Sequence, residues 1–176
     1  VFMDILGLGV LGSRIAEAVQ HFGFPLRGWS RSRKELPGIE CFAGGDELDA
    51  FLRGTRILVC VLPLTAETTQ ILNRSTLEKL PKGAYLINVA RGAHVAESDL
   101  LALIKSDHLA GATLDVFRNE PLPAQHPFWQ ESRISITPHI SALTLRDNSI
   151  SQIAEKIRAL EQGKSIAGIV DLSKGY

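Results

Sequence analysis

Residues 2–12 read FMDILGLGVLG, and this stretch decides the fold. Its first five residues are mostly apolar, which predicts a buried strand. Three glycines with the spacing GxGxxG follow the strand directly. Apolar residues then recur at helical spacing, at Leu11, Ile15, Val19 and Phe22. The stretch therefore predicts a strand, a glycine turn and a helix in immediate succession.

Each glycine of this turn has a physical role in dinucleotide binding. Gly7 makes the tight turn, Gly9 lets the backbone approach a pyrophosphate, and Gly12 allows the helix to pack closely on the strand. The helix that begins at Val10 and Leu11 presents backbone N–H groups and a partial positive charge to the phosphates. A GxGxxG motif alone is a weak signal in a chain with 15 glycines. Its place between a strand and a helix is what predicts dinucleotide binding.

The rest of the chain alternates between predicted strands and helices. Strands are expected over residues 26–29, 57–62, 84–89, 112–115 and 134–137, with a loop around Pro37-Gly38. Helices are expected near residues 46–52 with Asp46 as the cap, from Ser75 with a capping box to Glu78, over 99–105, and over 150–160 up to Gly163. This alternation predicts an α/β fold with a doubly wound, mainly parallel sheet of the Rossmann type. We expect residues 1–140 to form a dinucleotide-binding domain and residues 141–176 to form a C-terminal helix and tail.

The composition excludes several classes of protein. The 19 basic and 19 acidic side chains balance, which argues against nucleic acid or an anionic membrane as the main partner. Cys41 and Cys60 are too few for a disulfide scaffold or a four-ligand zinc site, so no metal is expected. The longest apolar stretch, residues 57–62, is far shorter than the roughly 20 residues of a membrane helix. Two unpaired cysteines and no visible signal peptide predict a cytoplasmic protein.

The end of the second predicted strand indicates which dinucleotide would bind. Enzymes that use NAD place an acidic residue about 20 positions after the glycines, on the ribose 2′-hydroxyl. Residues 29–34 read WSRSRK here, with no carboxylate before Glu35. Arg31 and Arg33 can each donate two hydrogen bonds to a 2′-phosphate, and Ser30 and Ser32 offer hydroxyls. The turn favours NADP(H) over NAD(H), and a solvated basic turn is the alternative.

Three polar residues follow predicted strands, where parallel sheets bind their ligands. Arg91 suits a substrate carboxylate, His139 suits proton transfer near neutral pH, and Glu120 beside it would favour the protonated imidazole. Together they fit the reduction of an oxo acid by hydride. Each residue could instead have a purely structural role. Arg91 could cap the end of its strand, Glu120 could be a solvated charge in a loop, and His139 could be a loop histidine whose hydrogen bonds are all made within the protein. The remaining histidines are expected to be structural or exposed: His21, His94, His108 and His126.

Seven ordered motifs resemble those of the D-isomer-specific 2-hydroxyacid dehydrogenases, over nearly the whole chain. They are GLGVLG at 7–12, WSRSRK at 29–34, LPLTAET at 62–68, NVARG at 88–92, LDVF at 114–117, NEP at 119–121 and TPHI at 137–140. The resemblance implies reduction of small 2-oxo acids, glyoxylate and hydroxypyruvate, to glycolate and glycerate with NADPH. It also implies a homodimer formed through the coenzyme domain.

The resemblance further implies roles for single residues. Arg91 would bind the carboxylate of the oxo acid and polarise its keto group. His139 would be the acid that protonates the new alkoxide, with Glu120 as its partner.

For the cofactor, the resemblance implies that Asp115 holds the nicotinamide amide and that Leu62 and Pro63 flank the adenine. Ser30 stands where the NAD-using members carry an acid, in agreement with the charge argument for NADPH. The family also has an N-terminal region that builds a substrate domain together with the returning C-terminal segment. Because the first strand begins at residue 2, we expect a fragment that binds NADPH and lacks groups that enclose the substrate. Residues 141–176 would return toward the missing domain.

Two other functions stay open at this point. A nucleotide-sensing regulator could keep the fold and use the bound cofactor to control association with a partner protein, because transcriptional corepressors share the scaffold. A different nucleotide-fold enzyme, such as a hydroxyacid dehydrogenase of the 6-phosphogluconate type, is disfavoured by the sequence Thr137-Pro138-His139. Replacing His139 with alanine in a full-length protein would distinguish an enzyme from a regulator.

Overall fold

The computed structural model describes residues 3–142 and 144–170. Its strands are β1 (Met3–Leu6), β2 (Leu26–Ser30), β3 (Ile39–Ala43), β4 (Ile57–Cys60), β5 (Ala84–Asn88), β6 (Leu109–Leu114) and β7 (Ile134–Ile136). Its helices are α1 (Val10–Gln20), α2 (Gly44–Arg53), α3 (Arg74–Leu77), α4 (Glu97–Lys105) and α5 (Arg146–Glu161), with short 3-10 helices η1 (Gly92–His94) and η2 (Pro127–Gln130).

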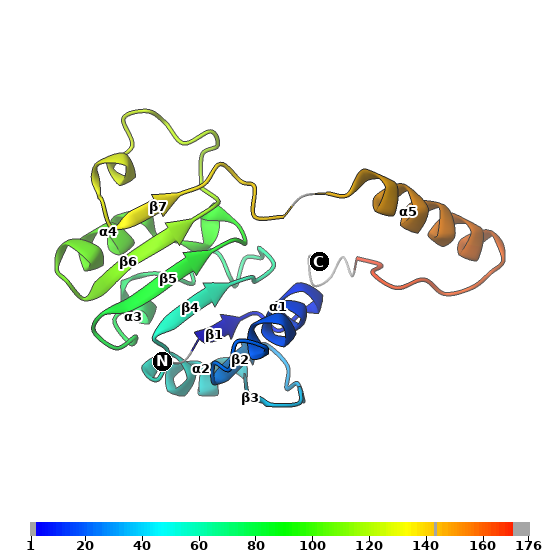
Figure 1. Cartoon of the computed structure of the whole chain (residues 1–176), viewed down its shortest axis with the longest axis horizontal. Helices are drawn as coiled ribbons and strands as arrows, with labels where there is room; N and C mark the ends of the chain where they lie inside the picture. Colours follow the sequence, from blue (N-terminus) through cyan, green and yellow to red (C-terminus); the bar gives the residue numbers. More distant parts are fainter. Residues whose placement is uncertain (1–2, 143, 171–176) are drawn as a thin grey trace. The chain divides into compact units, whose positions relative to one another are not determined.

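The strands form one parallel sheet in the order β3-β2-β1-β4-β5-β6-β7. From β1 the chain moves outward to β3 and then returns to β4 on the other side of β1, so the strand order reverses between β1 and β4. Figure 1 shows α1 on one face of the sheet and α2, α3 and α4 on the other. Helices on both faces confirm the predicted doubly wound fold. The reversal between β1 and β4 is the place where such sheets bind nucleotides.

The core consists of two apolar layers, one on each face of the sheet. The larger layer packs Phe51 of α2 and Leu100 of α4 against strand residues that include Leu58. The smaller layer packs Ala16 of α1 against strand residues that include Val59. Because neighbouring residues of β4 belong to opposite layers, this strand is apolar along its whole length, as in other parallel sheets covered on both faces.

One buried ion pair joins the sheet to α2. Asp4 of β1 is completely buried, and Arg27 of β2 is 8% exposed. The guanidinium donates to both carboxylate oxygens of Asp4, to the Phe51 carbonyl at 2.9 Å and to the Thr55 hydroxyl at 3.1 Å. Burial raises the pKa of Asp4, while the hydrogen bonds from Arg27 and Thr55 act in the opposite direction. The apolar pattern of residues 2–6 gave no sign of this pair.

Three strands differ from the prediction by more than one residue: β3, β4 and β6, the last of which begins at Leu109 and not at residue 112. Residues 39–43, expected to be part of a loop, form β3, which pairs with β2 at the edge of the sheet. The signal was missed because Glu40 interrupts the apolar pattern of this half-buried strand. The strand expected over residues 57–62 ends at Cys60, since its neighbours β1 and β5 end opposite that residue, at Leu6 and Asn88.

Two predicted helix caps are wrong. Helix α2 begins at Gly44, so Asp46 lies inside its first turn and not at the cap. Helix α3 is capped by Asn73, which forms a capping box with Thr76, and not by Ser75 with Glu78. In both helices the observed start lies before the predicted one: the N–H of Ala43 bonds to Glu47 in α2, and Asn73 and Thr76 bond to each other in α3.

The chain divides into two compact units, Val1–His139 and Ile140–Tyr176. The sheet belongs to the first unit and α5 to the second. Helix α5 confirms the predicted C-terminal helix, and four of the apolar residues that predicted it are more than half exposed: Ile150, Ile153, Ile157 and Leu160. Among the described residues, none of the helices is long and apolar enough to cross a membrane.

Candidate active site

Gly7 and Gly12 are required by the packing of the chain itself. Gly7 has a φ of +120°, and a Cβ added there would lie 3.0 Å from backbone atoms of Val61 and Leu62. A Cβ added to Gly12 would lie 1.8 Å from the carbonyl oxygen of Gly7. Both contacts bring the turn and α1 close to the end of β4, at the reversal of strand order.

Gly9 is different, because its environment within the chain would accept a side chain. A Cβ added there meets no atom of the described residues within 4 Å. Helix α1 follows directly, and its first turn carries no acidic residue. The first N–H groups of a helix and its positive dipole end bind anions, and a bare backbone allows close approach. The turn therefore fits the pyrophosphate of a dinucleotide.

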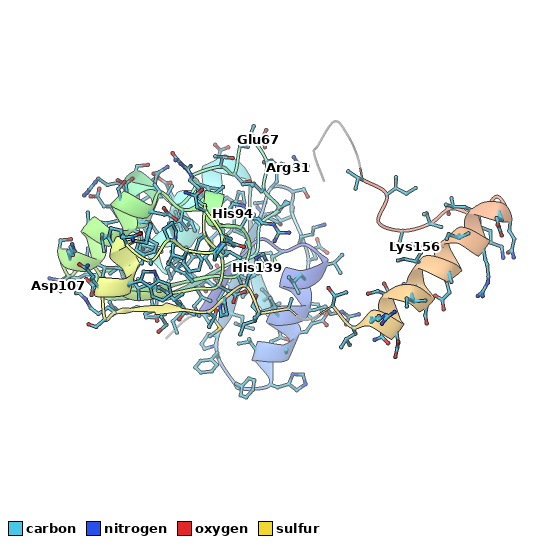
Figure 2. All side chains as sticks on the ribbon, turned by 90° about the horizontal axis from the view of Figure 1, so that it is seen from above. Arg31, Glu67, His94, Asp107, His139 and Lys156 are labelled. Carbon is cyan, nitrogen blue, oxygen red and sulfur yellow. The ribbon has the colours of Figure 1, made fainter. Side chains whose placement is uncertain are left out.

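The basic turn after β2 contains both buried and exposed side chains. Ser30 is 8% exposed, and its hydroxyl donates to the Ser32 carbonyl at 2.8 Å. Arg31 and Ser32 are exposed. Figure 2 shows Arg31 at the end of the first unit away from Asp107. Since Asp107 precedes β6, this is the end at which the strands finish.

Arg33 is held against β3 and α2. It donates at 2.6 Å to the Cys41 carbonyl, and a second nitrogen donates to the carboxylate of Glu47. The other oxygen of Glu47 accepts the N–H of Ala43 at 2.6 Å, just before α2 begins. These two hydrogen bonds lower the pKa of Glu47, and the bond from Ala43 has the larger effect. One carboxylate thus caps α2 and orients Arg33.

His139 and Glu120 form a hydrogen-bonded pair. Nδ1 of His139 lies 2.8 Å from Oε2 of Glu120, and Oε1 of Glu120 accepts the N–H of Phe117 at 2.9 Å. These bonds, led by the one to His139, lower the pKa of Glu120. The backbone of His139 has a φ of +54°, a left-handed conformation that is uncommon for residues other than glycine. With Nδ1 bound to Glu120, Nε2 is the nitrogen that can exchange a proton with a substrate.

Arg91 follows β5, next to the segment that carries Glu120. Its Nη1 donates to the Ala90 carbonyl at 2.6 Å. A Cβ added to the next residue, Gly92, would lie 1.9 Å from the carbonyl carbon of Phe117. Only glycine permits this contact between backbones. The structure thereby brings the Arg91 segment onto the segment that leads to the Glu120–His139 pair.

Asp115 follows β6 and is 1% exposed. The hydroxyl of Thr137 donates to its Oδ1, and the N–H of Thr137 donates to the Leu114 carbonyl at 3.1 Å. Thr137 therefore orients the carboxylate expected to hold a nicotinamide amide. Thr137 was predicted only as part of the TPHI motif, although its place two residues before His139 was a usable signal.

Leu62 and Pro63 follow β4, and the backbone of Leu62 lies against Gly7 of the glycine turn. Leu62 is buried, and the Pro63 carbonyl accepts the Thr68 hydroxyl at 2.7 Å. A second donor to this carbonyl is His94, whose Nε2 lies 3.3 Å away. The expected adenine-flanking segment is therefore tied to the loop after β5.

A cavity of about 450 Å³ lies beside the His139–Glu120 pair. Apart from these two residues its walls are apolar or aromatic: Phe117, Pro121, Leu122, Trp129, Ile136 and Pro138. No cluster of three His, Cys, Asp or Glu side chains suited to a metal ion occurs within residues 3–142 and 144–170.

A doubly wound sheet with a glycine turn at its reversal point defines a dinucleotide-binding domain. Residues 3–141 match the family described as D-isomer specific 2-hydroxyacid dehydrogenase, NAD binding domain. The chain belongs to this family, as the seven motifs predicted.

Two curated relatives are similar over 99% of the chain. A protein named glyoxylate/hydroxypyruvate reductase A from Citrobacter koseri is 54% identical over 174 residues, and one of the same name from Salmonella paratyphi B is 52% identical. The match covers 56% of each relative, so the chain spans about half of their length.

Two solved structures match the whole chain closely. A D-isomer specific 2-hydroxyacid dehydrogenase from Xanthobacter autotrophicus Py2, in complex with NADPH and MES, is 44% identical with a TM-score of 0.97, and the match covers 73% of that chain. An NADPH-dependent glyoxylate/hydroxypyruvate reductase from Sinorhizobium meliloti, in complex with NADP and sulfate, is 36% identical with a TM-score of 0.96, and 57% of it is covered.

Proposed function

We propose that this chain is the coenzyme-binding part of an NADPH-dependent reductase of small 2-oxo acids, glyoxylate and hydroxypyruvate. The observation that carries the proposal is the 2.8 Å pair of His139 and Glu120 beyond the end of β7, because a histidine held by a carboxylate suits proton transfer. Arg91 follows another strand of the same sheet, and Gly92 packs its segment on Phe117. The names of the curated relatives support the same substrates.

Each residue has a defined task in this proposal. The guanidinium of Arg91 binds the substrate carboxylate and polarises the keto group. The Glu120 carboxylate holds Nδ1 of His139, so that Nε2 donates its proton to the keto oxygen. A bound nicotinamide would supply the hydride for the keto carbon, which leaves a 2-hydroxy acid and an oxidised cofactor. Asp115, oriented by Thr137, holds the nicotinamide amide.

We also propose that NADP(H) is preferred over NAD(H). Arg31 and Arg33 bind the 2′-phosphate, with Ser30 and Ser32, while Leu62 and Pro63 flank the adenine. The two solved relatives with NADPH or NADP support this choice. A chain with Arg31→Ala and Arg33→Ala should bind NADPH and NADH with nearly equal affinity in fluorescence titrations. An unchanged affinity ratio would refute the role of these arginines.

Because the chain spans about half of the length of the curated relatives, the test joins it to the part of the Citrobacter koseri reductase that lies outside the match. We call this protein the joined enzyme. It should oxidise NADPH when hydroxypyruvate is added, and His139→Ala should reduce kcat by about 100-fold or more, because the proton donor is lost. A joined enzyme that binds NADPH and reduces neither oxo acid would contradict the proposed function.

Other expectations accompany this proposal. The enzyme would be a cytoplasmic homodimer that joins through the coenzyme domain, without nucleic acid or membrane as a partner. Residues 141–176 would pack on the substrate domain. The exposed apolar side chains of α5 support such packing, because an apolar helix face in water favours burial.

A further inference from the structure

His94 links the loop that carries Arg91 to the loop that carries Pro63. The residue lies in η1, three positions after Arg91, and is completely buried. Its Nδ1 lies 3.3 Å from the backbone nitrogen of Arg91, and its Nε2 lies 3.3 Å from the carbonyl oxygen of Pro63. We propose that His94 is a positioning residue that fixes Arg91 and the Leu62-Pro63 segment as one unit. This inference rests on the proposed function.

The hydrogen bonds around Arg91 define the protonation of the His94 ring. The carbonyl of Arg91 already accepts the side-chain N–H of Asn88 at 3.1 Å and the backbone N–H of His94 at 3.2 Å. Two donors use both lone pairs of a carbonyl oxygen. Nδ1 also lies 3.0 Å from this carbonyl oxygen, which already has these two donors. Nδ1 is therefore assigned as the acceptor of the Arg91 N–H, with the ring proton on Nε2 toward the Pro63 carbonyl. Burial lowers the pKa of His94, which agrees with a neutral ring.

Both ends of this link are themselves fixed. The Pro63 carbonyl also accepts the Thr68 hydroxyl, and the same hydroxyl accepts the N–H of Thr65 at 2.8 Å. At the other end, Asn88 belongs to β5 and accepts the N–H of Ala90 at 3.1 Å. His94 thus connects a cross-linked loop after β4 with the end of β5. Figure 2 shows His94 and His139 at the same end of the first unit.

The link matters because a carboxylate-binding arginine acts at a defined distance from the cofactor. Loss of the ring would free the backbone of Arg91 on one side and the Pro63 loop on the other. A displacement of about 1 Å between reacting groups can reduce a rate by about 100-fold. The expected effect is therefore on substrate binding and turnover, beyond any loss of stability.

Two variants separate the two bonds of His94. In His94→Asn, the amide oxygen takes the place of Nδ1 and accepts the N–H of Arg91, but the shorter side chain does not reach Pro63. In His94→Phe, the ring volume is kept and both bonds are lost. His108→Phe is the matched control, since Nε2 of His108 makes a similar 3.3 Å contact with the Leu77 carbonyl just before β6. That contact lies at the opposite end of the strands.

Two measurements are needed for each variant. Steady-state kinetics of the joined enzyme give kcat and KM for hydroxypyruvate. Hydrogen exchange of the 176-residue chain reports on residues 63–68 and 90–95 directly. We expect His94→Phe to raise KM about tenfold and to speed exchange in both segments. His94→Asn should recover KM and protect residues 90–95 alone, and His108→Phe should lower Tm without changing KM.

The inference is overturned if His94→Phe keeps the exchange rates of both segments, or if it leaves KM unchanged in a joined enzyme that turns over. It is also overturned if His94→Asn behaves as His94→Phe. Failure of the wild-type joined enzyme to reduce any oxo acid would instead contradict the proposed function. In that case the exchange rates alone still decide whether His94 links the two loops.

Discussion

Gly7, Gly9 and Gly12 differ in what surrounds them. The first and third are in contact with backbone atoms at 3.0 Å or less when a Cβ is added, whereas the second meets no atom of the described residues within 4 Å. At the scale of single residues, Gly7 and Gly12 are needed for packing within the fold, whereas Gly9 leaves space for a ligand. A stability measurement and a binding measurement should therefore separate them.

The first prediction concerns Gly9→Ala and Gly12→Ala in the 176-residue chain. Gly9→Ala should unfold at nearly the wild-type temperature and bind NADPH about tenfold more weakly, because its Cβ occupies the approach of the pyrophosphate. Gly12→Ala should lose about 1–3 kcal/mol of stability through the overlap with Gly7. Thermal unfolding and NADPH fluorescence titrations provide the two readouts. Equal loss of stability in both variants would refute the distinction.

At the scale of elements, single carboxylates connect segments that are distant in the sequence. Glu47 links α2 to the basic turn through Arg33, and Glu120 links the β6–β7 loop to His139. Both carboxylates have a lowered pKa. The largest cause is the hydrogen bond from Ala43 for Glu47 and the hydrogen bond from His139 for Glu120. Each should therefore affect both local order and ligand binding.

Glu47→Gln provides the second prediction. The amide oxygen can still accept the N–H of Ala43, but the negative charge beside Arg33 is removed. Arg33 should then interact more strongly with a 2′-phosphate, so the affinity for NADPH should rise relative to NADH by a few-fold. Asp46→Asn is the control, since it removes the same charge from the same turn of α2. An equal change in both variants would point to net charge and not to the contact with Arg33.

The third prediction is a pH dependence at Glu120. The pKa of Glu120 in the folded chain lies below the ordinary value of 4.5. The ionised carboxylate therefore stabilises the fold at every pH above that ordinary pKa. That stabilisation disappears as the pH falls through the lowered pKa. Tm should therefore fall more steeply between about pH 5 and pH 3 for the wild type than for Glu120→Gln. Parallel curves would show that the pair with His139 does not contribute to folding.

At the scale of the whole molecule, the sheet, α2 and the larger layer of the core meet at the buried pair of Asp4 and Arg27. The guanidinium contacts β1 and α2 at once and lies 5.6 Å from the ring centre of Phe42 in β3. A buried charge without its partner is strongly destabilising, whereas an apolar pair of similar volume is tolerated.

The fourth prediction follows from this asymmetry. Arg27→Met should reduce the free energy of unfolding by about 3–5 kcal/mol, because Asp4 stays buried without a counter-charge. The double variant Asp4→Val, Arg27→Met should recover a large part of that loss. Urea denaturation of both proteins measures the difference. A double variant as unstable as Arg27→Met would show that the pair acts by more than charge compensation.

The sequence by itself determined the elements that depend on close neighbours. The strand, glycine turn and helix of residues 3–20 follow from periodicity and spacing within a few residues, and strand ends then predicted where Arg91, Glu120 and His139 would lie. The same local patterns gave the right helices but the wrong caps for α2 and α3, since several polar residues compete for the cap within a few positions, Asn73 with Ser75 in α3 for example.

Only the tertiary structure decided which side chains meet across long separations. Asp4 with Arg27, Arg33 with Glu47, and His94 with Pro63 are separated by 23, 14 and 31 residues. No periodicity along the chain encodes such a pair, because the partners become neighbours only when the parallel strands and the segments that follow them pack together. The nucleotide turn is thus a local property of the sequence, whereas the geometry around Arg91 is a property of the folded chain.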